Sequence, residues 1–470
     1  MVFIPSFYGL CLLCLILYVY TKTKVASSED GSFRKFQATY LLVYLLATAG
    51  DWLQGPHVYV LYQSYGMTTH QIEILFVAGF GASMIFGTVI GSFADRYGRR
   101  ANCILYGIMY GLACITKHFP NFHILMIGRL LGGTATSILF SAFESWLVYE
   151  HNARGFSSDL LSTVFSHATL GNSLAAIAAG LVAQVFADHF GYVAPFDVSF
   201  TVLMIMCFCI VTTWTENYGD VNVSVGTSMK SALKLIKEDR KVLCLGLIQS
   251  LFEGAMYTFV LEWTPALTPP DTGDSPAGMK VPEDEEEIHK NSIPHGWIFA
   301  DFMVAVMIGS AIFKILCKYA SPESFMRIVL FLSSISLLMP IIVPGNQALI
   351  FAGFIVFEIC VGIFWPAMGT MRSMYVPEAT RSTVMNLFRI PLNMIVIVIL
   401  LQDLPMVIIF RCCVAFLLVA CVAQQVLFSQ VETLHSEKSP STQTAPGSTQ
   451  EAAISSPAKP KNGSNGNGKQ

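Results

Sequence analysis

The sequence has few charged residues. Asp, Glu, Lys and Arg make up 13% of its 470 residues, about half the share found in a typical soluble domain. By contrast, 54% of the residues are hydrophobic. This composition excludes an ordinary soluble globular protein and predicts a polytopic protein embedded in a lipid bilayer. The net charge of −3 carries no argument about nucleic acid, but the sequence has no basic patch of the kind that binds it, so we expect no nucleic-acid partner.

The sequence also lacks the residue patterns of catalysis. It has no cluster of metal ligands, no phosphate-binding loop, no nucleophile–base pair and no ATP-binding domain. The 12 cysteines lie in or beside apolar runs, as small buried hydrophobic residues do, and not in the spacing of a disulfide framework or a zinc site. We therefore expect neither an enzyme nor a primary pump, and we predict no cofactor and no bound metal.

Apolar runs, by contrast, are abundant, and many have the length of about 20 residues that crosses a bilayer. The first run is 3–21, and twelve more follow at 38–62, 71–94, 101–118, 122–148, 163–187, 194–214, 242–265, 296–316, 324–343, 347–371, 382–401 and 405–428. These twelve fall into two groups of six. We therefore predict an all-α membrane protein with two six-helix bundles plus an extra N-terminal transmembrane helix.

Polar stretches between the runs divide the chain into parts. The predicted parts are an N-terminal membrane anchor helix with a cytoplasmic linker (1–37), an N-terminal six-helix bundle (38–214), a cytoplasmic central loop (215–241), a C-terminal six-helix bundle (242–428) with an extracellular acidic insert (266–295), and a disordered cytoplasmic tail (429–470). Within the central loop, the periodic segment 229–237 predicts a short helix at the membrane surface.

The distribution of positive charge predicts the orientation. Lysine and arginine are concentrated in the segments predicted to be cytoplasmic, whereas the outer loops hold only Lys117, Lys280 and Lys290. The C-terminus is therefore predicted to be cytoplasmic. The first helix has no basic residue before it and two lysines after it, so we interpret it as an uncleaved anchor with its N-terminus outside; a cleaved signal is the alternative.

One charged stretch between two apolar runs has a distinctive pattern, Gly91-Ser-Phe-Ala-Asp-Arg-Tyr-Gly-Arg-Arg100. Because charges are costly inside lipid, it must lie at a membrane surface. The pattern resembles the signature of the loop between helices 2 and 3 of the major facilitator superfamily, where that loop is cytoplasmic. The resemblance implies the major facilitator superfamily fold, with a substrate cavity between two halves. It also implies a gate at Gly91, Asp95, Arg96, Gly98, Arg99, Arg100 and Glu144.

Two contacts are expected of this gate. Asp95 is expected to point at the N-terminus of helix 382–401, where Ser382 and Thr383 offer capping groups and the helix dipole favours an anion. The second contact is expected to join a basic residue of the motif to an acidic residue near the end of span 122–148: Arg96, Arg99 or Arg100 with Glu144 or Glu150. The alternative is that the charges of the motif only fix the topology.

Five ionisable residues lie deep within the predicted spans: Asp51, Arg129, Glu253, Glu358 and Arg389. Each would cost roughly 2.5–3.5 kcal/mol at the bilayer centre, so the five must face one another or water. Resemblance to the superfamily adds that the first, fourth, seventh and tenth of the twelve core helices line its central cavity. Here these are the spans 38–62, 122–148, 242–265 and 347–371. Each of those four helices carries one of these charges, which indicates a polar transport path.

The chemistry of the side chains suggests their roles. Arginines are permanently charged forks that suit tetrahedral oxyanions, whereas a desolvated carboxyl group can change protonation. The predicted substrate-binding residues are Arg129, Arg389, Gln54, Asn172 and Asn386. The candidates for proton coupling are Asp51, Glu253 and Glu358. The alternative is that the charges form structural ion pairs that hold the two halves together.

Several strings are similar to those of one family within the superfamily, the molybdate-anion transporters. They include Asp51-Trp-Leu-Gln-Gly-Pro56, Phe140-Ser-Ala-Phe-Glu-Ser-Trp146 and Asn386-Leu-Phe-Arg389. The resemblance implies secondary active uptake of molybdate, a tetrahedral oxyanion, across the plasma membrane by alternating access, with a proton as a candidate coupling ion. Two alternatives stay open: a carrier for another anion or organic solute, and a non-transporting scaffold or receptor that uses the acidic loop and the tail.

Overall fold

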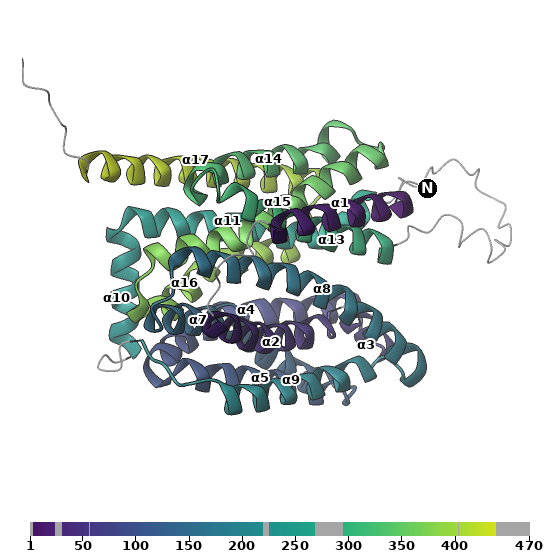
Figure 1. The fold of residues 1–470 in the computed structure, drawn as a ribbon. Helices are drawn as coiled ribbons and strands as arrows, with labels where there is room; N and C mark the ends of the chain where they lie inside the picture. Colours follow the sequence, from purple (N-terminus) through teal and green to yellow (C-terminus); the bar gives the residue numbers. More distant parts are fainter. Residues whose placement is uncertain are drawn as a thin grey trace, which may run out of the picture. The chain divides into compact units, whose positions relative to one another are not determined.

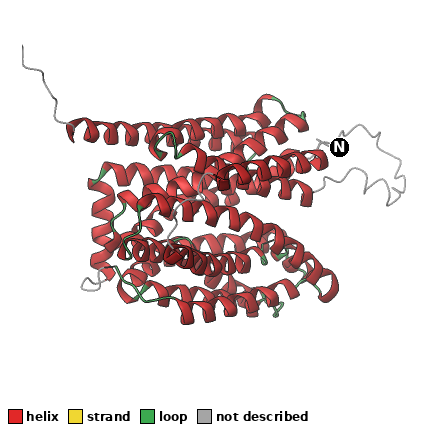
Figure 2. Ribbon diagram, viewed as in Figure 1, coloured by secondary structure: helices red, strands yellow, loops and turns green. Residues whose placement is uncertain are grey.

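The computed structural model describes residues 3–23, 31–55, 57–219, 225–267, 295–402 and 404–438. In these ranges the chain is helical, without a β-strand (Figure 2). The described residues up to Gln430 form one compact unit, and the last turns of the final helix, Val431 to Lys438, belong to a second. Most of the predicted acidic insert 266–295 and the tail beyond Lys438 lie outside the described residues.

The helices follow one another along the chain (Figure 1). Their bounds are α1 (Phe3–Thr23), α2 (Gly31–Trp52), α3 (Val58–Ser64), α4 (Thr69–Tyr97), α5 (Arg99–Thr116), α6 (Phe122–Leu139), α7 (Ala142–Ala153), α8 (Ser158–Phe190), α9 (Ala194–Thr213), α10 (Val225–Glu238), α11 (Arg240–Leu267), α13 (His295–Leu316), α14 (Pro322–Ile342), α15 (Gln347–Tyr375), the 3₁₀ turn η1 (Glu378–Thr380), α16 (Arg381–Leu401) and α17 (Met406–Lys438).

Eleven stretches of the described chain are long and apolar enough to cross a membrane. The predicted spans 38–62 and 101–118 are not among them, yet their helices α2 and α5 pack within the same bundle, against α8 and α9 and against α6. The short surface helix predicted at 229–237 is present as α10, which lies across the ends of α4, α11 and α16 (Figure 1). Helix α17 continues past the expected end of its span at 428, to Lys438.

Two predicted spans are broken helices. The span 38–62 divides after Trp52 into α2 and α3, at the sequence Gly55-Pro56, because the residue before a proline disfavours helical geometry. The span 122–148 divides at Phe140 and Ser141 into α6 and α7. Both breaks lie at the central cavity described below, so each one delivers side chains to it.

Helix α1 packs against α13, on the C-terminal half of the chain (Figure 1). Phe7, Leu10 and Cys11 lie against Val304 and Ile308. The hydroxyl of Ser6 donates a 3.0 Å hydrogen bond to Oδ2 of Asp301, a buried acidic residue in α13. The extra N-terminal helix is therefore attached to the bundle by both apolar packing and a polar contact.

Close packing of α4 on α6 depends on Gly133. A Cβ at this position would lie 2.0 Å from the carbonyl oxygen of Gly79. We expect Gly133→Ala to destabilise the purified protein by about 1–3 kcal/mol, because overpacking forces the two helices apart. The measurement is the thermal unfolding midpoint in detergent.

The matched control for this glycine is Gly81→Ala, on α4. A Cβ at Gly81 meets nothing within 4 Å, and alanine favours a helix over glycine by about 1 kcal/mol. This variant is expected to keep or slightly raise the unfolding midpoint. Equal midpoints for Gly133→Ala and the wild type would contradict the packing argument.

Candidate functional site

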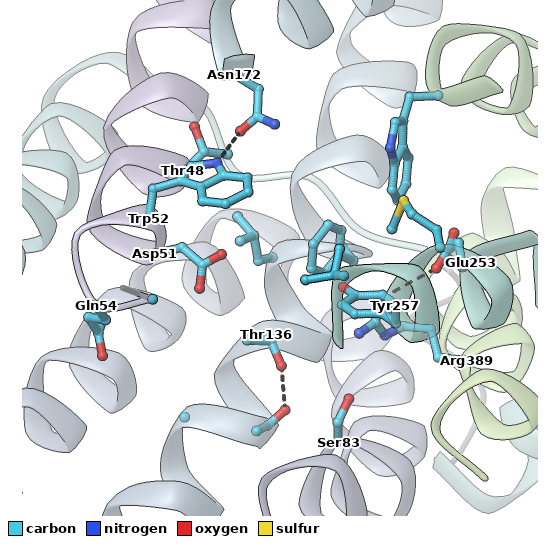
Figure 3. Close-up of a pocket in the computed structure, with 18 of the residues that line it drawn as sticks. Thr48, Asp51, Trp52, Gln54, Ser83, Thr136, Asn172, Glu253, Tyr257 and Arg389 are labelled. Atoms are coloured by element: carbon cyan, nitrogen blue, oxygen red, sulfur yellow. Dashed lines mark hydrogen bonds and ion pairs between the residues drawn. The ribbon is translucent and has the colours of Figure 1, made fainter. Parts of the chain in front are cut away.

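A cavity of about 500 Å³ lies between the first and second halves of the chain. Its lining includes all five deep charges that the sequence singled out, Asp51, Arg129, Glu253, Glu358 and Arg389. Figure 3 shows three of them, with Asp51 and Glu253 approaching the hollow from opposite sides. The fold thus brings together residues that are more than 300 positions apart in the sequence: Asp51 at the end of α2, and the other four within α6, α11, α15 and α16.

Glu253 and Arg389 form a loose pair in this cavity. Nη1 of Arg389 lies 3.9 Å from Oε2 of Glu253, which is beyond hydrogen-bond distance. Both side chains are almost fully buried, and neither carboxylate oxygen of Glu253 has a hydrogen-bond partner among the described residues. The guanidinium also lies over the ring of Phe140, 4.6 Å from its centre, and beside Tyr257 (Figure 3). A loosely paired arginine is available to another anion.

A second, tighter ion pair was not predicted. Arg372 donates from Nε to Oε1 of Glu144 at 2.8 Å and from Nη2 to Oε2 at 2.5 Å, so the pair is bidentate. Nη1 of Arg372 donates to Gln249, and all three residues line the cavity. The sequence signal was weak, because Arg372 follows the expected end of its span at 371, whereas α15 runs on to Tyr375.

The polar residues near the end of α2 hold one another in place. Asp51 accepts a 2.5 Å hydrogen bond from the hydroxyl of Tyr110. The indole of Trp52 donates to Oδ1 of Asn172 at 3.0 Å (Figure 3). Gln54 lines the cavity, but its amide donates to the hydroxyl of Ser199 on α9. Asp51 and Asn172 are therefore held by other residues that line the cavity, whereas Gln54 is held by α9.

Glu358 is the least compensated acid of the cavity. It is 5% exposed, and it has no ion pair or hydrogen bond to its side chain within the described part of the chain. A buried carboxylate without a partner is expensive, so Glu358 is better suited to carrying a proton than to balancing a fixed charge.

Asn386, one of the predicted substrate-binding residues, does not line the cavity. Its amide donates to the hydroxyl of Ser141 at 2.9 Å and to the carbonyl of Ser382 at 3.1 Å. It lies where α16 crosses α4, since a Cβ at Gly91 would meet its amide nitrogen at 2.6 Å. Asn386 therefore contributes to helix packing, and Asn393, about two helical turns further on, lines the cavity instead.

The charged motif makes the first of its two expected contacts. Oδ2 of Asp95 accepts hydrogen bonds from the backbone N–H (3.0 Å) and the hydroxyl (2.9 Å) of Thr383, in the first turn of α16. Oδ1 accepts from Arg99 at 3.0 Å. We call Asp95, Arg99 and Thr383 the motif latch, because they join the N-terminal half of the chain to α16 across buried side chains.

The second expected contact is wrong in its partners. Glu144 pairs with Arg372, and Glu150 pairs with Arg154 at 3.1 Å on its own helix. The basic residues of the motif bind elsewhere: Arg99 donates to the carbonyl oxygens of Ser145 and Glu378, Arg100 donates to that of Val211, and Arg96 lies over the ring of Tyr97. Arg99 therefore pairs with Asp95, four residues before it, and Arg99 and Arg100 also donate to backbone carbonyl oxygens nearby instead of to Glu144.

Comparison with known proteins agrees with this architecture. A family model described as sugar transporters with 12 TM matches residues 2–363, and the model of the Major Facilitator Superfamily matches residues 285–460. Among solved structures, the human organic anion transporter aligns with a TM-score of 0.64 at 14% identity, over 84% of this chain and 100% of that one. The E. coli fucose:proton symporter aligns with a TM-score of 0.63 at 13% identity, over 84% and 99%. These two likenesses show the fold.

Curated relatives are closer in sequence. The molybdate-anion transporter of Xenopus tropicalis is 31% identical over 92% of this chain and 95% of its own length. Those of Xenopus laevis and Takifugu rubripes are 33% and 31% identical, each over 80% of this chain and 81% of the relative. The protein is a multi-pass membrane protein, and the chain belongs to the molybdate-anion transporter family of the major facilitator superfamily.

Proposed function

We propose that this protein is a secondary active transporter of alternating-access type that takes up molybdate across the plasma membrane. The observation that carries the proposal is the cavity between the halves, into which Arg129 and Arg389 bring charged forks. Molybdate is a tetrahedral dianion, and arginine matches the oxygens of such anions with two N–H groups at once. The curated relatives, which carry molybdate-anion transport in their names, support this choice of substrate.

The geometry suggests how substrate and proton compete. Arg389 is held only loosely by Glu253, at 3.9 Å. An incoming oxyanion would offer Arg389 a better ligand, and protonation of Glu253 would remove its competitor. Glu358, buried without a partner in the described chain, is a second group suited to a coupled proton. We propose that uptake is coupled to protons through these two carboxyl groups, with Asp51 as a third candidate.

We propose that the motif latch forms and breaks as the transporter alternates between its two states. It joins the two halves at the motif end, because Asp95 on α4 caps α16 of the other half. Alternating access requires such contacts to form in one state and break in the other. In the orientation that positive charge predicts, this end is cytoplasmic, so the latch would hold the two halves together on the cytoplasmic side.

Uptake of molybdate by cells tests the proposal. We expect Arg129→Gln and Arg389→Gln each to lower the initial rate by at least tenfold at unchanged surface abundance, since one lost charged hydrogen bond is worth about 1.5–3 kcal/mol. The matched control is Arg327→Gln, whose guanidinium contacts Gln425 and Phe428 outside the cavity, and which should keep its rate. The same assay with and without an imposed pH gradient tests proton coupling.

Two results would redirect the proposal. Normal uptake by both cavity variants would remove the arginines from the substrate path. Full inhibition by organic anions but none by sulfate or tungstate would favour a carrier for organic solutes. Deletion of 271–293 separates a transporter, which should tolerate it, from a scaffold that depends on the acidic insert.

A further inference from the structure

Two cations of the first half lie beside one tight helix crossing. A Cβ at Gly128 on α6 would lie 2.0 Å from the hydroxyl oxygen of Thr116, the last residue of α5. Lys117 follows Thr116 in the sequence, and Arg129 follows Gly128. Both line the cavity. The contact between the two helices therefore fixes Lys117 and Arg129 in the same part of the wall.

Lys117 is buried as few lysines are. It is 3% exposed, although the charge pattern of the sequence assigned it to an outer loop. Its Nζ donates a 2.5 Å hydrogen bond to the hydroxyl of Tyr62 and lies over the rings of Tyr62 and Phe196. A lysine that snorkels to the membrane surface would expose its ammonium, so a topological role alone does not account for this position.

The ammonium of Lys117 has unused capacity. It carries three donors, and Tyr62 accepts only one of them. No carboxylate lies within ion-pair distance of Lys117 in the described part of the chain. A buried cation without a counter-ion is costly, and a bound anion would offset that cost.

Arg129 also lacks an acidic partner among the described residues. Its Nε donates to the carbonyl oxygen of Leu75 at 3.1 Å, and its guanidinium lies 4.3 Å from the ring centre of Phe76. Its terminal Nη atoms have neither a hydrogen bond nor an ion pair among the described residues. Arg372 and Arg389, by contrast, each face a glutamate in the same cavity. The cationic groups of the cavity thus divide into a compensated set and an uncompensated pair.

The uncompensated pair lies at the end of the cavity opposite the motif latch. Helix α5 begins at Arg99 of the latch and has 18 residues, so Lys117 lies roughly 27 Å further along it. Arg129 lies at about the same level, because its neighbour Gly128 on α6 meets Thr116, the residue before Lys117. An anion entering from that end would meet these two cations before it reached the Arg389–Glu253 pair.

We infer that Lys117 and Arg129 form a binding station for a tetrahedral dianion, separate from the Arg389–Glu253 pair and nearer the end of the cavity away from the latch. The inference rests on the proposed anion transport and adds a substrate-contacting residue, Lys117, and an order of contacts. Two positive charges without acidic partners complement a dianion and are in excess for a monoanion of the same shape. The station therefore selects for charge, whereas the deeper pair, with its carboxylate, responds to protons.

Equilibrium binding to the purified full-length chain tests the station. The ligands are radiolabelled molybdate and perrhenate, a tetrahedral monoanion of similar size. For Lys117→Met we expect the Kd of molybdate to rise at least tenfold and that of perrhenate no more than about threefold, because the lost charge acts on two ligand charges in one case and on one in the other. Lys117→Arg should stay within about threefold of the wild type for both ligands.

Tyr62→Phe is the matched control. It removes the hydrogen bond to Lys117 and keeps the charge, so the ratio of the two dissociation constants should be that of the wild type. An unchanged ratio in Lys117→Met, with wild-type binding intact, would overturn the station. Absence of molybdate binding to the wild type would instead overturn the proposed function. Should Lys117→Met fail to fold, the same ratio measured on Lys117→Gln decides the question.

Discussion

Replacement of Asp95 by alanine is expected to open the motif end of the protein and to abolish transport. The carboxylate accepts three hydrogen bonds, from Thr383 N–H, the Thr383 hydroxyl and Arg99. Arg99 is fully buried, so its guanidinium would lose its only acidic partner within the described residues. Breaking a buried pair by removing one partner costs about 3–5 kcal/mol. That free energy would be lost from the latched state alone.

Thermal unfolding and uptake, measured together, check this expectation. Asp95→Ala should lower the unfolding midpoint and reduce uptake by more than a hundredfold, since each 1.4 kcal/mol changes an equilibrium constant about tenfold. Thr383→Val, which keeps the backbone donor and loses only the hydroxyl, should cost about 1 kcal/mol. Asp197→Ala is the control: this aspartate also faces a basic side chain, His118, but at an exposed site where such pairs contribute little. Equal behaviour of the Asp95 and Asp197 variants would argue against the latch.

The gathering of the deep charges was predictable because it follows from a local cost. An ionised group in lipid is unfavourable wherever it lies on the helix, so Asp51 and Arg129 had to face a shared polar space, and both line the cavity. The cap formed by Asp95 was predictable for a similar reason. The start of α16 was visible in the sequence, and helix N-termini attract carboxylates.

The pairing of charges was not predictable, because it depends on which helix faces which. Glu144 had several candidate partners in sequence, and only the packing of α7 against the C-terminal half selects Arg372. Asn386 lies outside the cavity for a related reason. Its depth in the span is right for the cavity, but its direction around α16 points it at Ser141 and the crossing with α4.

The two helix breaks show different limits of sequence reasoning. The sequence Gly55-Pro56 is a local signal for the end of α2. The prediction of one span over 38–62 followed the length of the apolar run instead of this signal. The break between α6 and α7 has none, because neither Phe140 nor Ser141 is a helix breaker. Tertiary contacts account for it: Phe140 stacks on Trp365 and lies under Arg389, and Ser141 accepts from Asn386.

Removing Arg372 is expected to have a comparably large effect, because its ion pair with Glu144 is a second contact between the two halves of the chain. Arg372→Met would leave Glu144 facing the cavity without its bidentate partner and would remove the donor to Oε1 of the Gln249 side chain. We expect a loss of about 3–5 kcal/mol in stability, measured by the unfolding midpoint. Arg154→Met is the matched control, because its pair with Glu150 is on the neighbouring turns of α7 and its side chain is 42% exposed, so its contribution should be within about 1 kcal/mol.

Charge reversal distinguishes a structural role of this pair from substrate binding. If Arg372 serves only to hold α7 to α15, the double variant Glu144→Arg with Arg372→Glu should recover stability and uptake together, since the pair is restored with its ends exchanged. If Arg372 also contacts the oxyanion, stability should recover while uptake stays low, because Glu would then occupy the position of a substrate ligand. Glu144→Gln gives the converse test. It frees the guanidinium, so substrate contact predicts tighter molybdate binding in a less stable protein, whereas a purely structural pair predicts the loss of stability alone.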